Sequence, residues 1–195
     1  KFTQFLKAKK EAEQILKIEK RNIWALQYLL FLSEKEENWD QAVGLTKQIQ
    51  KITGKHDPDD LARFQVYKGL EKLKSGFPDE ARSFFNKALK SSPDFGLPYR
   101  YLGDVFEQIR DLVKAVENWE SFAVRDIKNA SMVFGKIESA LFDLGRYSEV
   151  ENFYRRILEI DSSNFEAIIR LANVLEEKGE DGAALSLIED AIDPQ

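Results

Sequence analysis

Apolar residues recur at steps of three and four along most of this chain, the spacing that places side chains on one face of an α-helix. A clear stripe contains Tyr99, Leu102, Phe106 and Ile109. Short runs containing glycine, proline, serine or asparagine separate such stripes, and runs of this kind end helices. The pattern therefore predicts an all-α chain built from short amphipathic helices.

A short sequence motif recurs along the chain and sets the period of these helices. It occurs five times, and its last residues are Ala42, Ala81, Ala115, Val150 and Ala184. The intervals between them are 39, 34, 35 and 34 residues. The underlying unit is therefore 34 residues long, with five extra residues before Ala81 and one before Val150. Each unit has room for two helices joined by a short turn.

Residues within each unit match the pattern of tetratricopeptide repeats, whose period is also about 34 residues. The fullest match is Tyr99-x2-Leu102-Gly103-x2-Phe106, followed by Ala115, Trp119 and Phe122. Small residues at Gly69 and Gly103 are expected where two helix backbones approach closely, with Phe85 and Trp119 filling the space opposite. The chain thus resembles a tetratricopeptide-repeat protein, which implies a right-handed α-solenoid of helix-turn-helix repeats.

The repeat register divides the chain into one partial and five full units. We expect a single superhelix, with 1–22 as the second helix of a partial repeat and full repeats at 23–56, 57–95, 96–130, 131–164 and 165–195. Glu138 departs from the pattern because a small residue is expected there, and Val150 stands where alanine is expected. The acidic last helix either caps the array or continues into a further unit, and the sequence leaves both open.

Composition excludes several kinds of chemistry within the chain. Cysteine is absent, so there are no disulfides, thiolate metal sites or cysteine nucleophiles, and a single histidine, His56, excludes a multi-histidine metal site. His56 lies in the insert near Pro58, with no nucleophile beside it. The insert is either a longer loop, with Asp57 capping the next helix, or a contact loop. We therefore expect no enzyme activity, no metal site and no cofactor in this chain.

Charge is distributed unevenly behind a net value of −5. Residues 1–22 carry a net charge of +4, and residues 161–195 carry −7. The overall acidity argues against nucleic-acid binding, which needs a basic face, and no apolar run of about 18 residues is present to span a bilayer. The basic start is either a solvated helix face or a segment near anionic lipid that follows an upstream anchor. Because the first residue is Lys1 rather than Met, we expect a longer protein.

In stacked repeats of this type, the first helix of each unit lines a concave groove. We predict that this groove binds a protein or peptide through Trp24, Gln27, Phe31, Arg63, Arg100, Asp104, Glu107, Arg170 and Asn173. Arg100 is the strongest single candidate, because arginine and aromatic residues dominate interface hot spots. Trp24 and Phe31 have an alternative role, which is packing against the first helix. The sequence does not decide the oligomeric state, and a homo-oligomer is one alternative.

The order and spacing of the units from Ile23 to Ala184 are similar to those of the lipopolysaccharide assembly protein B family. The matching features are Ala25-Leu26-Gln27-x-Leu29-Leu30, Trp39-Asp40-Gln41-Ala42, the positions of the two inserts, and Leu171-Ala172-Asn173-Val174-Leu175-Glu176. The resemblance implies the cytoplasmic repeat part of a bacterial inner-membrane protein. The transmembrane helix and a rubredoxin-like metal domain with two Cys-x-x-Cys pairs would lie outside this chain.

The same resemblance implies a function for the repeats. They would form a non-catalytic scaffold that regulates lipopolysaccharide synthesis by helping the membrane protease FtsH degrade the deacetylase LpxC. The chain would then lie in the cytoplasm, tethered to the inner membrane by a segment outside it. The alternative is an unrelated bacterial repeat adaptor, in secretion or envelope assembly, that binds a peptide or protein in its groove.

Overall fold

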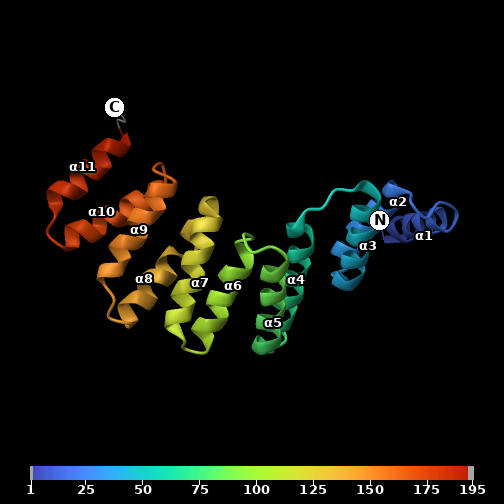
Figure 1. Cartoon of the computed structure of the whole chain (residues 1–195), viewed down its shortest axis with the longest axis horizontal. Helices are drawn as coiled ribbons and strands as arrows, with labels where there is room; N and C mark the ends of the chain where they lie inside the picture. The colour runs from blue at the N-terminus through green and yellow to red at the C-terminus, as the bar shows by residue number, and fades with distance from the viewer. Residues whose placement is uncertain (1, 193–195) are drawn as a thin grey trace. The chain divides into compact units, whose positions relative to one another are not determined.

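The computed structural model describes residues 2–192, with side chains from residue 5 onward. Helices make up the regular structure of this part of the chain, and no strand occurs within it (Figure 1). The prediction of an all-α chain is confirmed. Lys1 and residues 193–195, which the predicted repeat boundaries include, lie outside the described residues.

The chain divides into two compact units, Lys1–Pro93 and Asp94–Gln195. The helices of the first unit are α1 (Phe2–Ile18), α2 (Ile23–Lys35), α3 (Trp39–Thr53), α4 (Pro58–Lys74) and α5 (Pro78–Ser91). Those of the second are α6 (Leu97–Gln108), α7 (Leu112–Arg125), the 3-10 helix η1 (Ile127–Val133), α8 (Phe134–Asp143), α9 (Ser148–Ile160), α10 (Phe165–Glu177) and α11 (Asp181–Ile192). Consecutive helices pack as hairpins, as α4 with α5 and α6 with α7. The single superhelix over residues 1–195 stays a prediction.

One backbone feature recurs at the turn inside each hairpin, where a residue adopts a positive φ. Glu37, Gly76, Arg110, Gly145 and Gly179 have φ values of 52°, 83°, 64°, 69° and 78°. They are spaced at 39, 34, 35 and 34 residues, the same intervals as the sequence motif. Glycine suits this left-handed position at a helix end because it has no Cβ to clash. The repeat register is therefore visible in the backbone itself.

Polar side chains cap helix N-termini both at the start of repeats and at the turns inside them. Asn22, Asn38, Asp111 and Asn164 each accept a hydrogen bond from the backbone N–H three residues on, at 3.0–3.3 Å. In the insert, Asp57 caps α4 by accepting from the Asp59 N–H at 2.9 Å. Such caps satisfy N–H groups that have no partner inside the helix. The capping role predicted for Asp57 is confirmed.

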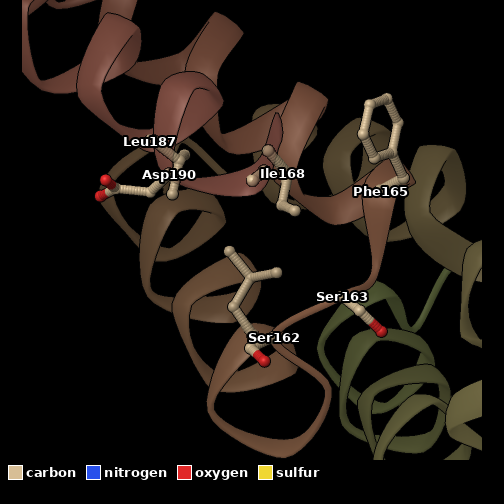
Figure 2. Close-up of a pocket in the computed structure, with 8 residues that line it drawn as sticks. Ser162, Ser163, Phe165, Ile168, Leu187 and Asp190 are labelled. Carbon is tan, nitrogen blue, oxygen red and sulfur yellow. The ribbon is translucent and has the colours of Figure 1, made fainter. Parts of the chain in front are cut away.

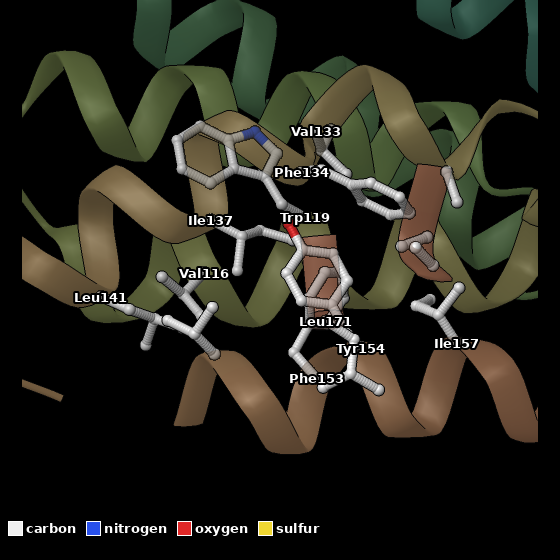
Figure 3. Close-up of a cluster of buried hydrophobic side chains, with 14 of the residues drawn as sticks. Val116, Trp119, Val133, Phe134, Ile137, Leu141, Phe153, Tyr154, Ile157 and Leu171 are labelled. Carbon is white, nitrogen blue, oxygen red and sulfur yellow. The ribbon is translucent and has the colours of Figure 1, made fainter. Parts of the chain in front are cut away.

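The core of the second unit combines aliphatic residues with large aromatic side chains of α7, α8 and α9 (Figure 3). Phe134 packs edge-on against both Phe153 and Tyr154, with ring centroids 5.6 and 5.2 Å apart. Trp119 is fully buried beside them. Aromatic pairs prefer this edge-to-face arrangement, and each ring removes a large apolar surface from water. The burial stabilises the stacking of neighbouring hairpins.

Two glycines allow the close helix approach that the repeat pattern predicts. A Cβ on Gly103 would lie 2.8 Å from Trp119 Cγ and still closer to two other indole atoms. A Cβ on Gly69 would lie 2.8 Å from Phe85 Cδ1 and also closer to another ring atom. The aromatic rings therefore occupy the space that a larger residue would need. The predicted small-to-large packing at both positions is confirmed.

Glu138 occupies in its repeat the position that Gly69 and Gly103 hold in theirs. Its partner in the pattern is Tyr154, whose hydroxyl donates a hydrogen bond to Glu138 Oε1 at 2.6 Å. A carboxylate thus meets a phenol where a glycine meets an aromatic ring elsewhere. The first helix of this repeat is also irregular, because it starts as η1 and becomes α-helical only at Phe134. The departure noted in the sequence is accommodated by a polar contact.

Candidate functional site

The predicted binding residues of α6 hold ion pairs and hydrogen bonds within the second unit. Asp104 Oδ1 accepts a hydrogen bond from Lys136 Nζ at 2.8 Å and from Trp119 Nε1 at 3.1 Å. Lys136 also reaches Glu107 Oε2 at 3.3 Å. Although burial of the ammonium opposes it, the hydrogen bond and charge of Asp104, with those of Glu107, raise the pKa of Lys136. One ammonium therefore pairs with two carboxylates across the first helices of two repeats.

A second charge cluster joins α8 to α10 around Arg170. Its Nη1 donates to Glu138 Oε2 at 2.7 Å, and its Nε donates to Glu166 Oε1 at 2.7 Å. Tyr154 completes the cluster through its hydrogen bond to Glu138. Burial, together with the adjacent Glu138 carboxylate, raises the pKa of Tyr154 well above its usual value. The phenol is therefore held in its neutral, hydrogen-donating form.

Arg100, the strongest candidate from the sequence, lies on α6 and makes weaker contacts. Its Nη1 is 3.5 Å from the sulfur of Met132, and its guanidinium lies 5.3 Å from the centre of the Tyr101 ring. Met132 belongs to η1 rather than to α8, and its side chain is exposed. Arg100 therefore keeps donors for a partner, whereas the guanidinium of Arg170 is already paired with two carboxylates.

Two adjoining hollows open on the surface formed by α8, α9 and α10, and we call them together the α8–α10 groove. One, of about 370 Å³, is lined by Glu138, Phe142, Val150, Glu166, Ile169, Arg170, Asn173, Val174 and Glu177. The other, of about 360 Å³, is lined by Phe142, Tyr147, Ser148, Val150, Val174, Glu177 and Lys178. The predicted residues Arg170 and Asn173 are thus brought together in this groove.

Three exposed apolar side chains line the α8–α10 groove beside its polar residues. Phe142 and Ile169 are 44% and 45% exposed, and Tyr147 is 62% exposed. The ring centroids of Phe142 and Tyr147 lie 5.4 Å apart, and Phe142 lines both hollows. Exposed apolar groups bordered by paired charges are typical of the centre and rim of a protein interface. An apolar segment can therefore contact Phe142 and Ile169 while Arg170 keeps its carboxylate partners.

The predicted residues of the first unit lie on α2 and α4. Arg63 Nη2 pairs with Glu34 Oε1 at 2.7 Å, and its guanidinium stacks 4.6 Å from the centre of the Phe64 ring. Gln27 is exposed, as are Trp24 (83%) and Phe31 (44%). The alternative of packing against the first helix is therefore wrong for Trp24. These three residues are spaced by three and four positions and share one face of α2.

A further hollow, of about 390 Å³, lies where α9, α10 and α11 meet (Figure 2). Its lining is mostly apolar, and Asp190 is the one titratable side chain among the described residues that line it. Across residues 5–192, no group of three or more histidine or acidic side chains could hold a metal ion.

None of the helices within residues 2–192 has both the length and the apolar character required to cross a bilayer.

The ion pairs between the first helices of neighbouring repeats were not predicted from the sequence, although the sequence contains a signal for them. Asp104 and Lys136 are 32 residues apart, and so are Glu138 and Arg170. Opposite charges at nearly one repeat period face each other on the first helices of stacked units. Tyr154 was missed as well, although it occupies the repeat position of an aromatic core residue. Searching for opposite charges at the repeat spacing would have found both ion pairs.

Comparison with known proteins supports the repeat assignment. No protein-family model matches the chain. Lipopolysaccharide assembly protein B of Escherichia coli strains K12 and O157:H7 is 23% identical over 162 residues, which cover 83% of this chain. The chain resembles this protein. It spans about two fifths (41%) of the length of these curated relatives.

Several solved structures were also compared with the chain. MamA from AMB-1 is 22% identical with a TM-score of 0.44, covering 88% of this chain and 96% of its own. BtubC from P. vanneervenii is 17% identical with a TM-score of 0.48, covering 97% and 87%. PilF of Pseudomonas aeruginosa is 15% identical with a TM-score of 0.48, covering 87% and 75%. With TM-scores below 0.5, these structures support no further inference.

The helical hairpins, the repeat register in the backbone and the resemblance agree with one another. The chain is a tetratricopeptide-like scaffold of the kind that takes protein partners.

Proposed function

We propose that this chain is a non-catalytic scaffold that binds a segment of a partner protein in the α8–α10 groove, without a cofactor of its own. The observation that carries this proposal is the exposure of Phe142 and Ile169 in a hollow whose arginine, Arg170, is already paired. Burying these two side chains under a partner would release water from apolar surface. Asn173, which is exposed in the same hollow, offers an amide to a partner backbone.

The resemblance to lipopolysaccharide assembly protein B supports a role in the assembly of lipopolysaccharide. In this role the scaffold brings the deacetylase LpxC to the membrane protease FtsH. It works in the cytoplasm and is tethered to the inner membrane by a segment outside this chain. Because the chain spans 41% of the length of these relatives, this assignment extends to the repeat region alone.

The experiment measures binding of purified LpxC and of FtsH to the immobilised 195-residue chain. The test variant is Phe142→Ser with Ile169→Ser, which removes the apolar groups of the groove. The matched control is Ile109→Ser with Ile160→Ser, since these residues are 51% and 52% exposed but do not line the groove. Circular dichroism checks that helical content is equal in all variants.

We expect at least one of the two proteins to bind to the unaltered chain. The groove variant should bind that protein at least about tenfold more weakly, because central apolar contacts dominate interface energy. The control variant should bind as the unaltered chain does. Absence of binding by both proteins would overturn the role in lipopolysaccharide assembly. Binding that the groove and control variants reduce equally would instead overturn the assignment of the groove.

A further inference from the structure

A large apolar side chain is exposed on each side of the turn between α1 and α2. Ile18, the last residue of α1, is 90% exposed, and Trp24, the second residue of α2, is 83% exposed. Among the large apolar residues that the structure describes, these two are the most exposed. Single exposed apolar residues are common on protein surfaces, but two such residues that flank one four-residue turn require an explanation.

Local hydrogen bonds hold this turn in one conformation. The Asn22 side chain caps α2 by accepting from the Ala25 N–H at 3.0 Å, and it donates to the Glu19 carboxylate at 2.7 Å. The Asn22 N–H also donates to the Glu19 carbonyl at 3.1 Å. Leu26, which follows on α2, is fully buried, so the start of this helix is anchored in the core. The exposure of Trp24 is therefore built into an ordered turn.

A basic hollow of about 640 Å³ lies at the same turn, between α1 and α3. It is lined by Leu16, Lys20, Arg21, Gln48, Lys51 and Ile52. Leu16 and Ile52 supply apolar surface, and the three cations supply positive charge. Within residues 5–192, none of these three cations forms an ion pair. Unpaired cations around an apolar floor attract an anion that is attached to an apolar body.

We propose that the α1–α2 turn docks onto the surface of an anionic phospholipid membrane. Lys20, Arg21 and Lys51 contact the headgroup phosphates, and Trp24 and Ile18 enter the interfacial layer. The turn and an anionic membrane are complementary in charge and in polarity. Cations are attracted to an anionic leaflet, and tryptophan favours the boundary between headgroups and acyl chains. The turn would act as a peripheral contact of the repeats themselves, independently of the groove and its partner.

The charge of the surrounding segment favours the membrane over other occupants. Glu19 is the one carboxylate within the turn, and it is engaged by Asn22. Residues 1–22 carry a net charge of +4, whereas the whole chain carries −5. Acidic parts of the protein are repelled from an anionic surface, so this basic, apolar patch also sets the orientation of docking.

The test is flotation of the 195-residue chain with vesicles of phosphatidylcholine alone or of phosphatidylcholine mixed with phosphatidylglycerol. We expect binding to the mixed vesicles only. Lys20→Gln with Arg21→Gln should lower the partition coefficient by about 30-fold, because each basic residue near an anionic surface raises that coefficient by about five- to sixfold. The control, Lys90→Gln with Lys128→Gln, removes the same charge from exposed sites elsewhere and should bind normally.

Tryptophan fluorescence provides a second measurement. The emission should shift to the blue when mixed vesicles are added, and Trp24→Phe should abolish this shift. Trp119 is buried in the core, and Trp39 stacks on Tyr67 at the opposite end of α3 from Lys51, so neither should change environment.

Three results would overturn the proposal. One is equal binding to neutral and mixed vesicles, and another is equal binding by the turn and control variants. The third is loss of vesicle binding in inorganic phosphate but not in chloride of equal ionic strength, which would indicate a site for a free anion.

Discussion

Replacing Gly103 with alanine would test the close approach of α6 and α7 most directly. The new Cβ would lie 2.8 Å from Trp119 Cγ and closer still to Cδ1 and Nε1 of the same ring. The indole is rigid and fully buried, so it must shift as a whole. A shift also strains the hydrogen bond that Trp119 Nε1 donates to Asp104 at 3.1 Å. The substitution therefore disturbs packing and a polar contact together.

The expected magnitude follows from these two effects and one opposing effect. Overpacking of a core costs about 1–3 kcal/mol, and weakening a hydrogen bond to a carboxylate costs about 1.5 kcal/mol. Alanine in a helix is more favourable than glycine by about 1 kcal/mol. We expect the free energy of unfolding to fall by about 2 kcal/mol on balance. In a chain of this size, that lowers the Tm by about 4–8 °C.

Urea denaturation with fluorescence detection would measure this loss. Trp24→Phe and Trp39→Phe in all samples leave Trp119 as the sole tryptophan, so the signal reports the second unit. The matched control is Gly135→Ala, because a Cβ there meets nothing within 4 Å and the site lies on α8 of the same unit. This control should be neutral or slightly stabilising. Equal stability of the Gly103 and Gly135 variants would refute the close-packing argument.

Two further substitutions test other parts of the fold. Tyr154→Phe should lower the free energy of unfolding by about 1–3 kcal/mol at neutral pH, because the phenol donates to the carboxylate of Glu138. The pKa of Tyr154 is raised in the folded chain above its ordinary value of 10.0. The Tyr154 hydroxyl therefore contributes fully to the free energy of unfolding below pH 10.0, and this contribution is lost as the pH rises above 10.0. Denaturation at several pH values should therefore show the two proteins converging in alkaline solution, and a constant difference would contradict this. Arg110→Gly should stabilise the chain by about 0.5–1 kcal/mol, because φ is 64° at this exposed turn residue and glycine adopts that angle without a clash. A lower Tm for this variant would show that positive φ is not the limiting feature.

The arrangement of charges along α6, α8 and α10 explains how the second unit tolerates many ionic groups near its core. Asp104 and Glu107 share Lys136, and Glu138 and Glu166 share Arg170. In each cluster two carboxylates meet one cation. A chain with a net charge of −5 can thus stack its first helices without large repulsion between neighbouring acids.

Helices and turns could be predicted from the sequence because local contacts decide them. Apolar steps of three and four define a helix face wherever they occur, and the motif that ends at Ala42 and Ala184 has the intervals of the positive-φ turns. The close packing at Gly69 and Gly103 was predicted for the same reason, since it depends on one hairpin. Each of these features joins residues that are near one another in the chain.

Whether the candidate binding residues are paired or exposed depends on the tertiary structure. The sequence by itself determined that Arg100, Asp104 and Arg170 lie on first helices, but it did not determine which of them are paired. That depends on how successive hairpins stack, which brings side chains 32 residues apart to hydrogen-bonding distance. The exposure of Trp24 was likewise decided by packing, because α1 could have covered this face of α2 and does not. A helical period specifies a face, whereas only the position of the neighbouring helix decides whether that face meets protein or water.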